Sequence, residues 1–217
     1  MNKKQLDELY HNLRELCLTE DLVQKEAIEG IVSHLTAPNG DYAGLLRFLS
    51  YYGEKYILRV AVIMLQSTAP PVKFDRVVEL GAGFGWLARG ISNNYDQLPT
   101  LLVDKRQWAF TDIIADVETN NGSKRVLDEL KSGDLIVMSE LLHCLDNPED
   151  LLRQLTAWPL LIVEYDPENR SYRNSYSAQI AKYGCKPVNN IRDMLPDNTV
   201  LYSHTDTHGI WLVLPSP

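Results

Sequence analysis

The stretch Arg76-Val77-Val78-Glu79-Leu80-Gly81-Ala82-Gly83-Phe84-Gly85 carries the most specific pattern in this 217-residue chain. A short apolar run that contains one acid ends in three glycines at alternate positions. The run predicts a buried strand, and the glycines predict a turn whose backbone approaches a ligand closely. A phosphate-binding P-loop would end in Gly-Lys-Ser/Thr, which Trp86-Leu87-Ala88 does not supply. The dinucleotide fingerprint would place its third glycine one residue later.

Further apolar runs that end at or near an acid follow along the chain. They are Thr100–Asp104, Thr111–Asp116, Gly133–Glu140 and Leu160–Glu164. Strands that alternate with helical segments in this way predict a parallel sheet covered on both faces. Asp104 follows the glycines by about twenty residues, a spacing at which an acid can accept both ribose hydroxyls of an adenosine.

The Glu-x-Gly-x-Gly-x-Gly motif and these strand ends resemble class I S-adenosylmethionine-dependent methyltransferases over roughly residues 74–165. The resemblance implies an α/β, Rossmann-like fold with a seven-stranded, mostly parallel sheet and a C-terminal antiparallel hairpin. It also implies S-adenosylmethionine as cofactor and methyl transfer to an oxygen, nitrogen or carbon of an acceptor. One departure is the connection Thr156-Ala157-Trp158-Pro159, where relatives carry a Pro-Gly-Gly turn.

When the functional positions of the family are transferred residue by residue to this sequence, the resemblance predicts a cofactor site along the ends of the strands. Glu79 would contact the amino-acid part of the cofactor, directly or through water, since a buried acid inside a strand needs a polar partner. Asp116 would accept from the adenine amino group, with Asp112 and Glu118 as alternatives. Glu140 would line the site or cap the following helix. The full set is Glu79, Gly81, Ala82, Gly83, Gly85, Asp104, Lys105, Asp116, Val117, Ser139 and Glu140.

His143 is the candidate catalytic residue, early in the helix expected after the fourth strand. A neutral imidazole there could take a proton from a hydroxyl or amine, although a histidine at this place could equally pack against the cofactor or the helix. Candidate substrate contacts are Tyr52, if its helix covers the cleft, and Tyr172 and Arg173 after the fifth strand. His204 and His208 flank the turn of the C-terminal hairpin, where we expect them to be exposed.

The chain divides near residue 70. Residues 1–70 carry helical periodicity, with a third helix expected from Asp41 to about Gln66, and predict a helical cap or lid. Residues 71–217 predict the methyltransferase core. It ends in a hairpin of Val200–His204 and Gly209–Leu214.

The amino-acid composition limits the classes of partner that we expect for this protein. A net charge of −8 without any cluster of Lys and Arg argues against nucleic acid and favours a small-molecule acceptor. No apolar stretch is long enough to span a bilayer, and three scattered cysteines predict free thiols in a reducing, cytoplasmic setting, with neither disulfide nor metal site. A homodimer is compatible with the sequence. A nicotinamide-dependent oxidoreductase and a non-catalytic binding protein of the same fold are the alternative classes.

Overall fold

The computed structural model describes residues 54–69, 71–83, 85–107, 111–165, 188, 191–196, 200–204 and 208–215. The predicted helices within residues 2–35, the first part of the third helix, and the candidate substrate residues Tyr52, Tyr172 and Arg173 lie outside these ranges. No helix in the described ranges is long and apolar enough to cross a membrane.

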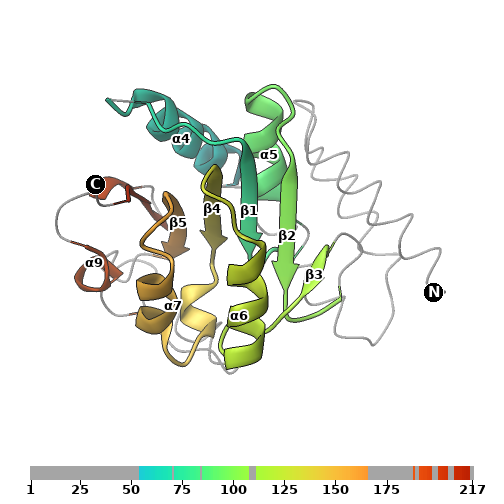
Figure 1. Cartoon of the computed structure of the whole chain (residues 1–217). Coiled ribbons are helices and arrows are strands. Elements are labelled where there is room, and N and C mark those ends of the chain that lie inside the picture. Colours follow the sequence, from blue (N-terminus) through green and yellow to red (C-terminus); the bar gives the residue numbers. More distant parts are fainter. Residues whose placement is uncertain are drawn as a thin grey trace, which may run out of the picture.

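One mixed β-sheet forms the centre of the protein (Figure 1). Its strands lie in the order β3-β2-β1-β4-β5-β7-β6. The first five strands along the chain pair in parallel, and β7 is antiparallel to both β5 and β6. The strands are β1 (Arg76–Leu80), β2 (Thr100–Asp104), β3 (Ile113–Ile114), β4 (Asp134–Ser139), β5 (Leu160–Tyr165), β6 (Val200–His204) and β7 (His208–Val213).

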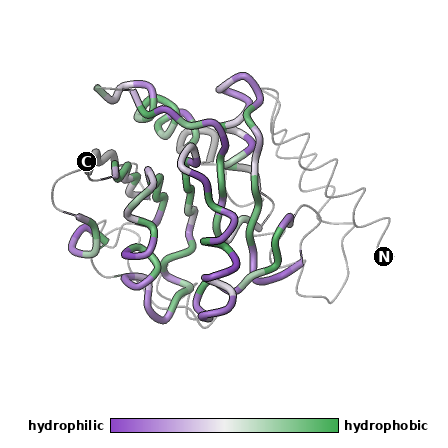
Figure 2. Tube along the Cα trace, in the orientation of Figure 1, coloured by the Kyte–Doolittle hydropathy of each residue, from purple (hydrophilic) through white to green (hydrophobic). Residues whose placement is uncertain are grey.

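The mostly parallel sheet with an antiparallel C-terminal pair confirms that part of the predicted fold. The strands were recognisable because a sheet covered on both faces needs apolar residues at successive positions. In β4, five of the six residues are buried, and the one acid among them, Asp134, forms an ion pair with Arg76 at 2.7 Å. Hydrophobic residues accordingly follow the strands through the middle of the molecule (Figure 2).

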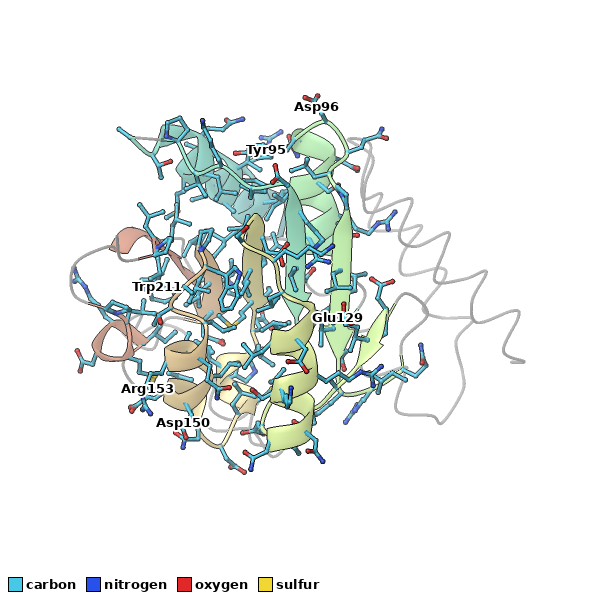
Figure 3. All side chains as sticks on the ribbon, in the orientation of Figure 1. Tyr95, Asp96, Glu129, Asp150, Arg153 and Trp211 are labelled. Atoms are coloured by element: carbon cyan, nitrogen blue, oxygen red, sulfur yellow. The ribbon has the colours of Figure 1, made fainter. Side chains whose placement is uncertain are left out.

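Helices cover both faces of the sheet. Inward side chains of α4 (Glu54–Ser67) and α5 (Trp86–Asn94) share one buried cluster with alternate residues of the strands. On the other face, α6 (Asn120–Glu129), α7 (Pro148–Gln154) and the short α9 (Ile191–Met194) share a second cluster with the remaining strand residues. Trp211 of β7 belongs to this second cluster and points toward α7 (Figure 3).

Helix α4 corresponds to the last part of the third helix that was expected within the cap. Its residues Ala61 and Leu65 are buried in the same cluster as Leu87 of α5 and Ile210 of β7. This helix is therefore packed as part of the core. The division of the chain near residue 70 remains a prediction for the residues that precede α4.

The segment after β4 differs from the expectation. Residues Leu142–Cys144 form a single 3-10 turn, and α7 begins only at Pro148. Proline fits the first position of a helix, where its missing N–H is not needed, and Glu149 and Asp150 follow in the first turn. His143 consequently lies in this 3-10 turn and not in α7, and Glu140 does not cap α7.

Candidate functional site

The glycine turn lies where the strand order reverses between β1 and β4, which is the place where open α/β sheets bind ligands. Gly81, Gly83 and Gly85 all have left-handed backbone conformations, with φ of 67°, 51° and 67°. L-residues adopt such φ values with strain, so the turn requires glycine at all three places.

The three glycines differ in what surrounds them. A Cβ atom added to Gly81 would lie 2.7 Å from Leu141 Cδ1, and one added to Gly85 would lie 2.3 Å from Leu102 Cδ1. A Cβ atom on Gly83 would meet no atom within 4 Å. Gly81 and Gly85 are therefore also required by packing inside the protein. Gly83 alone turns its Cα toward open space, where a ligand can approach the backbone.

Asp104, the last residue of β2, stabilises this turn by hydrogen bonding. Its Oδ2 accepts the Gly83 N–H at 3.0 Å, and its Oδ1 accepts the Arg106 N–H at 2.8 Å. The carboxylate is half-buried, and the neighbouring Lys105 is exposed. Ala82 fixes the turn through its backbone, since its N–H donates to Val103 and its carbonyl accepts from Gly85. The structure thus brings together the predicted residues of the turn and Asp104.

Glu79 lies beneath the turn and is only 2% exposed. Its Oε2 accepts the Ala88 N–H at 2.9 Å, so the carboxyl group caps the first turn of α5. Burial raises the pKa of Glu79 to about 8, and the nearby charge of Asp104 acts in the same direction, while the Ala88 hydrogen bond opposes both. The capping role was not foreseen, because a helix start nine residues away gives no sign at Glu79 itself.

Asp116 follows β3 and is half-buried. Its Oδ1 accepts the Glu118 N–H at 3.1 Å, and its carbonyl accepts from the Thr119 hydroxyl, the N-cap of α6. The two acids predicted as alternatives to Asp116 also accept backbone N–H groups. Asp112 Oδ2 accepts the Leu102 N–H, and Glu118 Oε1 accepts the Asp146 N–H. Each of the three carboxyl groups thus accepts a backbone N–H, and the contact of Asp116 with the adenine stays a prediction.

Val117 is half-buried and lines a pocket of about 490 Å³ between α6 and α7. The lining of this pocket includes none of the other predicted cofactor residues. The pocket is therefore separate from the glycine turn. On the outer surface of α7 beside it, the exposed side chains of Asp150 and Arg153 form an ion pair (Figure 3).

His143 is buried, at 1% exposure, and its Nδ1 lies 2.7 Å from Oε1 of Glu164. Glu164 is fully buried near the end of β5, and its Oε2 also accepts the Leu142 N–H at 3.0 Å. Burial lowers the pKa of His143, but the attraction and hydrogen bond of Glu164, together with the interactions of Cys144, outweigh it, and the pKa rises to about 10. The sequence marked Glu164 only as the end of a strand.

Glu140 directly follows Ser139, the half-buried last residue of β4. It pairs with His208, whose Nε2 lies 2.9 Å from Glu140 Oε1. The expectation that His208 is exposed is wrong, because its exposed fraction is 3%. It begins β7 opposite Tyr165 of β5, at the edge of the sheet where the parallel strands end. No group of three or more candidate metal ligands occurs among the described residues.

Comparison with known proteins shows the fold. No protein-family model matches the sequence, and no curated protein matches it. Solved structures do match. A plantazolicin methyltransferase in complex with S-adenosylhomocysteine superposes with a TM-score of 0.54 at 14% identity, covering 98% of this chain and 97% of that one. The protein has the fold of a class I S-adenosylmethionine-dependent methyltransferase.

Two further structures extend the comparison. Human N-acetylserotonin methyltransferase in complex with S-adenosylmethionine has a TM-score of 0.56 at 13% identity, covering 96% of this chain and 67% of that one. An O-methyltransferase family protein from Burkholderia thailandensis has a TM-score of 0.51 at 11% identity and is matched over 82% of this chain. The present chain spans 61% of the length of that protein.

Proposed function

We propose that this protein is an S-adenosylmethionine-dependent methyltransferase that acts on a small-molecule acceptor. The observation that carries the proposal is the left-handed glycine turn, open at Gly83 and braced by Asp104, at the reversal of strand order. The structures of similar fold support it, since they include complexes with S-adenosylmethionine and S-adenosylhomocysteine.

The residues at this edge fit the cofactor in shape and charge. The open space at Gly83 admits a ligand against the backbone. An ionised carboxylate has about four acceptor positions, and Asp104 uses one on each oxygen for backbone N–H groups, so acceptor positions remain for both ribose hydroxyls. The carboxyl group of Asp104 gives the edge an acidic character that suits a ligand with a sulfonium and an ammonium group.

S-adenosylmethionine supplies, when bound, a methyl group that its sulfonium already activates for displacement. What the protein adds is alignment of the acceptor, exclusion of water and removal of a proton. For the last task we propose His143. With Nδ1 directed at Glu164, Nε2 is the ring atom that, in the neutral form of the imidazole, would take the proton from an acceptor hydroxyl or amine. Glu164 then stabilises the resulting imidazolium.

The small-molecule class of acceptor draws support from the proteins of similar fold. They include the plantazolicin and N-acetylserotonin methyltransferases and an O-methyltransferase from Planctomyces limnophilus in complex with apigenin (TM-score 0.54, 15% identity). We further propose that residues before α4 form a cap over the site and contribute Tyr52. Tyr172 and Arg173 would complete the acceptor side.

Calorimetry tests the proposal directly. We expect the purified protein to bind S-adenosylmethionine and S-adenosylhomocysteine and to show no binding of NAD. Binding of NAD in place of the other two would establish the oxidoreductase alternative. Binding without transfer of labelled methyl groups to any of a panel of phenols, alcohols and amines would favour the non-catalytic alternative.

A further inference from the structure

The pair formed by Glu140 and His208 joins two parts of the chain that are 68 residues apart. The side chain of His208 is 4% exposed and that of Glu140 is 12% exposed. His208 begins the hairpin strand β7, and Glu140 begins the loop that leaves β4. The contact therefore ties the C-terminal hairpin to the end of a central strand.

Glu140 has a left-handed backbone conformation, with φ of 52°. A long side chain rarely adopts such a φ, and it persists where surrounding contacts determine it. Two contacts do so here. The Glu140 N–H donates to the Val163 carbonyl of β5 at 2.8 Å, and the carboxylate meets His208. Strained residues of this kind gather at functional sites, which makes the turn a candidate for function.

The next residue, Leu141, brings this turn into contact with the glycine motif. Its Cδ1 lies so close to Gly81 that a Cβ atom on that glycine would be 2.7 Å away. The turn of Glu140 and Leu141 is thus held on one side by β5 and β7, and its other side packs against the first glycine of the cofactor turn. A change at His208 can therefore affect Gly81 through Glu140 and Leu141.

We propose that His208 is a positioning residue for the amino-acid end of the cofactor site. This inference rests on the proposed function. Along the sheet order β3-β2-β1-β4, the adenine is expected at Asp116, which follows β3, and the ribose at Asp104 of β2. The amino-acid portion then extends toward β1 and β4, where His208 holds Glu140 and Glu140 sets Leu141 against Gly81.

Two probes separate positioning from general stability. S-adenosylhomocysteine contains the amino-acid portion, whereas 5′-methylthioadenosine shares the adenosine and sulfur but lacks it. By calorimetry, His208→Leu should weaken binding of S-adenosylhomocysteine by about tenfold or more. Its affinity for 5′-methylthioadenosine should change by less than about twofold. His208→Gln should restore the affinity, because a glutamine amide can donate to Glu140 from the place of Nε2.

Two further variants complete the experiment. Glu140→Gly removes the carboxylate but accepts the positive φ, so the relief of backbone strain offsets part of the stability lost with the His208 contact, and the folded variant should lose S-adenosylhomocysteine selectively. If His208→Leu unfolds, Glu140→Gly tests the positioning role in its place. Arg76→Gln breaks an ion pair at the opposite edge of the same sheet and should lower the melting temperature without changing the ratio of the two affinities.

The outcomes distinguish the two proposals. A wild-type protein that binds neither probe would remove the proposed function. A wild-type protein that binds both, with His208→Leu and Glu140→Gly either unaffected or weakened equally for both probes, would overturn the positioning role alone. Failure of His208→Gln to restore binding of S-adenosylhomocysteine would also count against it.

Discussion

At the scale of single residues, the site depends on buried titratable groups whose protonation is set by burial and by neighbouring groups. Glu79 is buried below the glycine turn, and its pKa is raised to about 8. His143 is buried beside Glu164, and its pKa is raised to about 10. In both cases the folded protein holds a proton to a higher pH than the unfolded chain does. The free energy of unfolding must therefore decrease with rising pH across the neutral range.

The contribution of Glu79 to this dependence of stability on pH can be measured. Between its ordinary pKa of 4.5 and about 8, the folded state binds more protons at this residue than the unfolded state, so stability falls as pH rises. Glu79→Gln keeps an oxygen that can accept the Ala88 N–H but cannot ionise. We expect denaturant unfolding to show a shallower loss of stability between about pH 5 and pH 8 for the variant than for the wild-type protein. Parallel pH curves would contradict the buried, protonated state.

Asp104 is the residue whose loss should affect cofactor binding most. Asp104→Ala removes a charged acceptor for the ribose hydroxyls, each such hydrogen bond contributing about 1.5–3 kcal/mol. It also releases the N–H groups of Gly83 and Arg106. Calorimetry should show at least about a tenfold weaker affinity for S-adenosylmethionine. A folded variant that binds with wild-type affinity would refute the assignment.

For His143, the raised pKa changes the expected dependence on pH. A base must be neutral, and its neutral fraction grows only as pH approaches 10, so kcat/KM should rise from pH 7 into the alkaline range. His143→Asn retains a donor toward Glu164 but cannot accept the proton, and turnover should fall by roughly 10²- to 10⁴-fold. Cofactor affinity should barely change. Near-normal turnover would leave His143 with a structural role only.

At the scale of elements, β7 shows how tightly the hairpin is fitted. A Cβ atom on Gly209 would lie 2.1 Å from the Trp211 ring, which packs in the cluster shared with α7. Gly209→Ala should therefore destabilise the protein by about 1–3 kcal/mol, measured by denaturant unfolding. Adding Trp211→Leu should remove the clash, so that the two changes are not additive. Simple additivity would show that the ring is not what opposes the new methyl group.

The elements also show what the sequence can and cannot reveal. The apolar runs located the central strands, and the boundaries of β6 and β7 differ from the expected ones by at most one residue. Contacts between distant residues were not accessible in this way. Glu164 meets His143 across 21 residues, and His208 meets Glu140 across 68, and both contacts depend on the order of the strands in the sheet. Nothing in the identity of Glu140 signals its positive φ.

At the scale of the whole molecule, the predicted cap remains to be tested. Deleting residues 1–36 should impair use of the acceptor more than it unfolds the core, because α4, which packs on the sheet, is retained. Circular dichroism melting and S-adenosylhomocysteine calorimetry should remain close to wild type, while methyl transfer falls. If the truncated protein transfers methyl groups normally, these residues have another role, such as a dimer interface.

The place of β7 has a consequence for how the protein folds. This strand follows β6 in the sequence but lies between β5 and β6 in the sheet, so β5 gains its second neighbour only when β7 docks onto it. Until it docks, the strand Leu160–Tyr165 is an open edge rich in large apolar residues, which is prone to pair with another chain. Docking is a long-range event, expected to be slow compared with helix formation. Chaperones that shield this edge during synthesis should therefore raise the yield of folded protein.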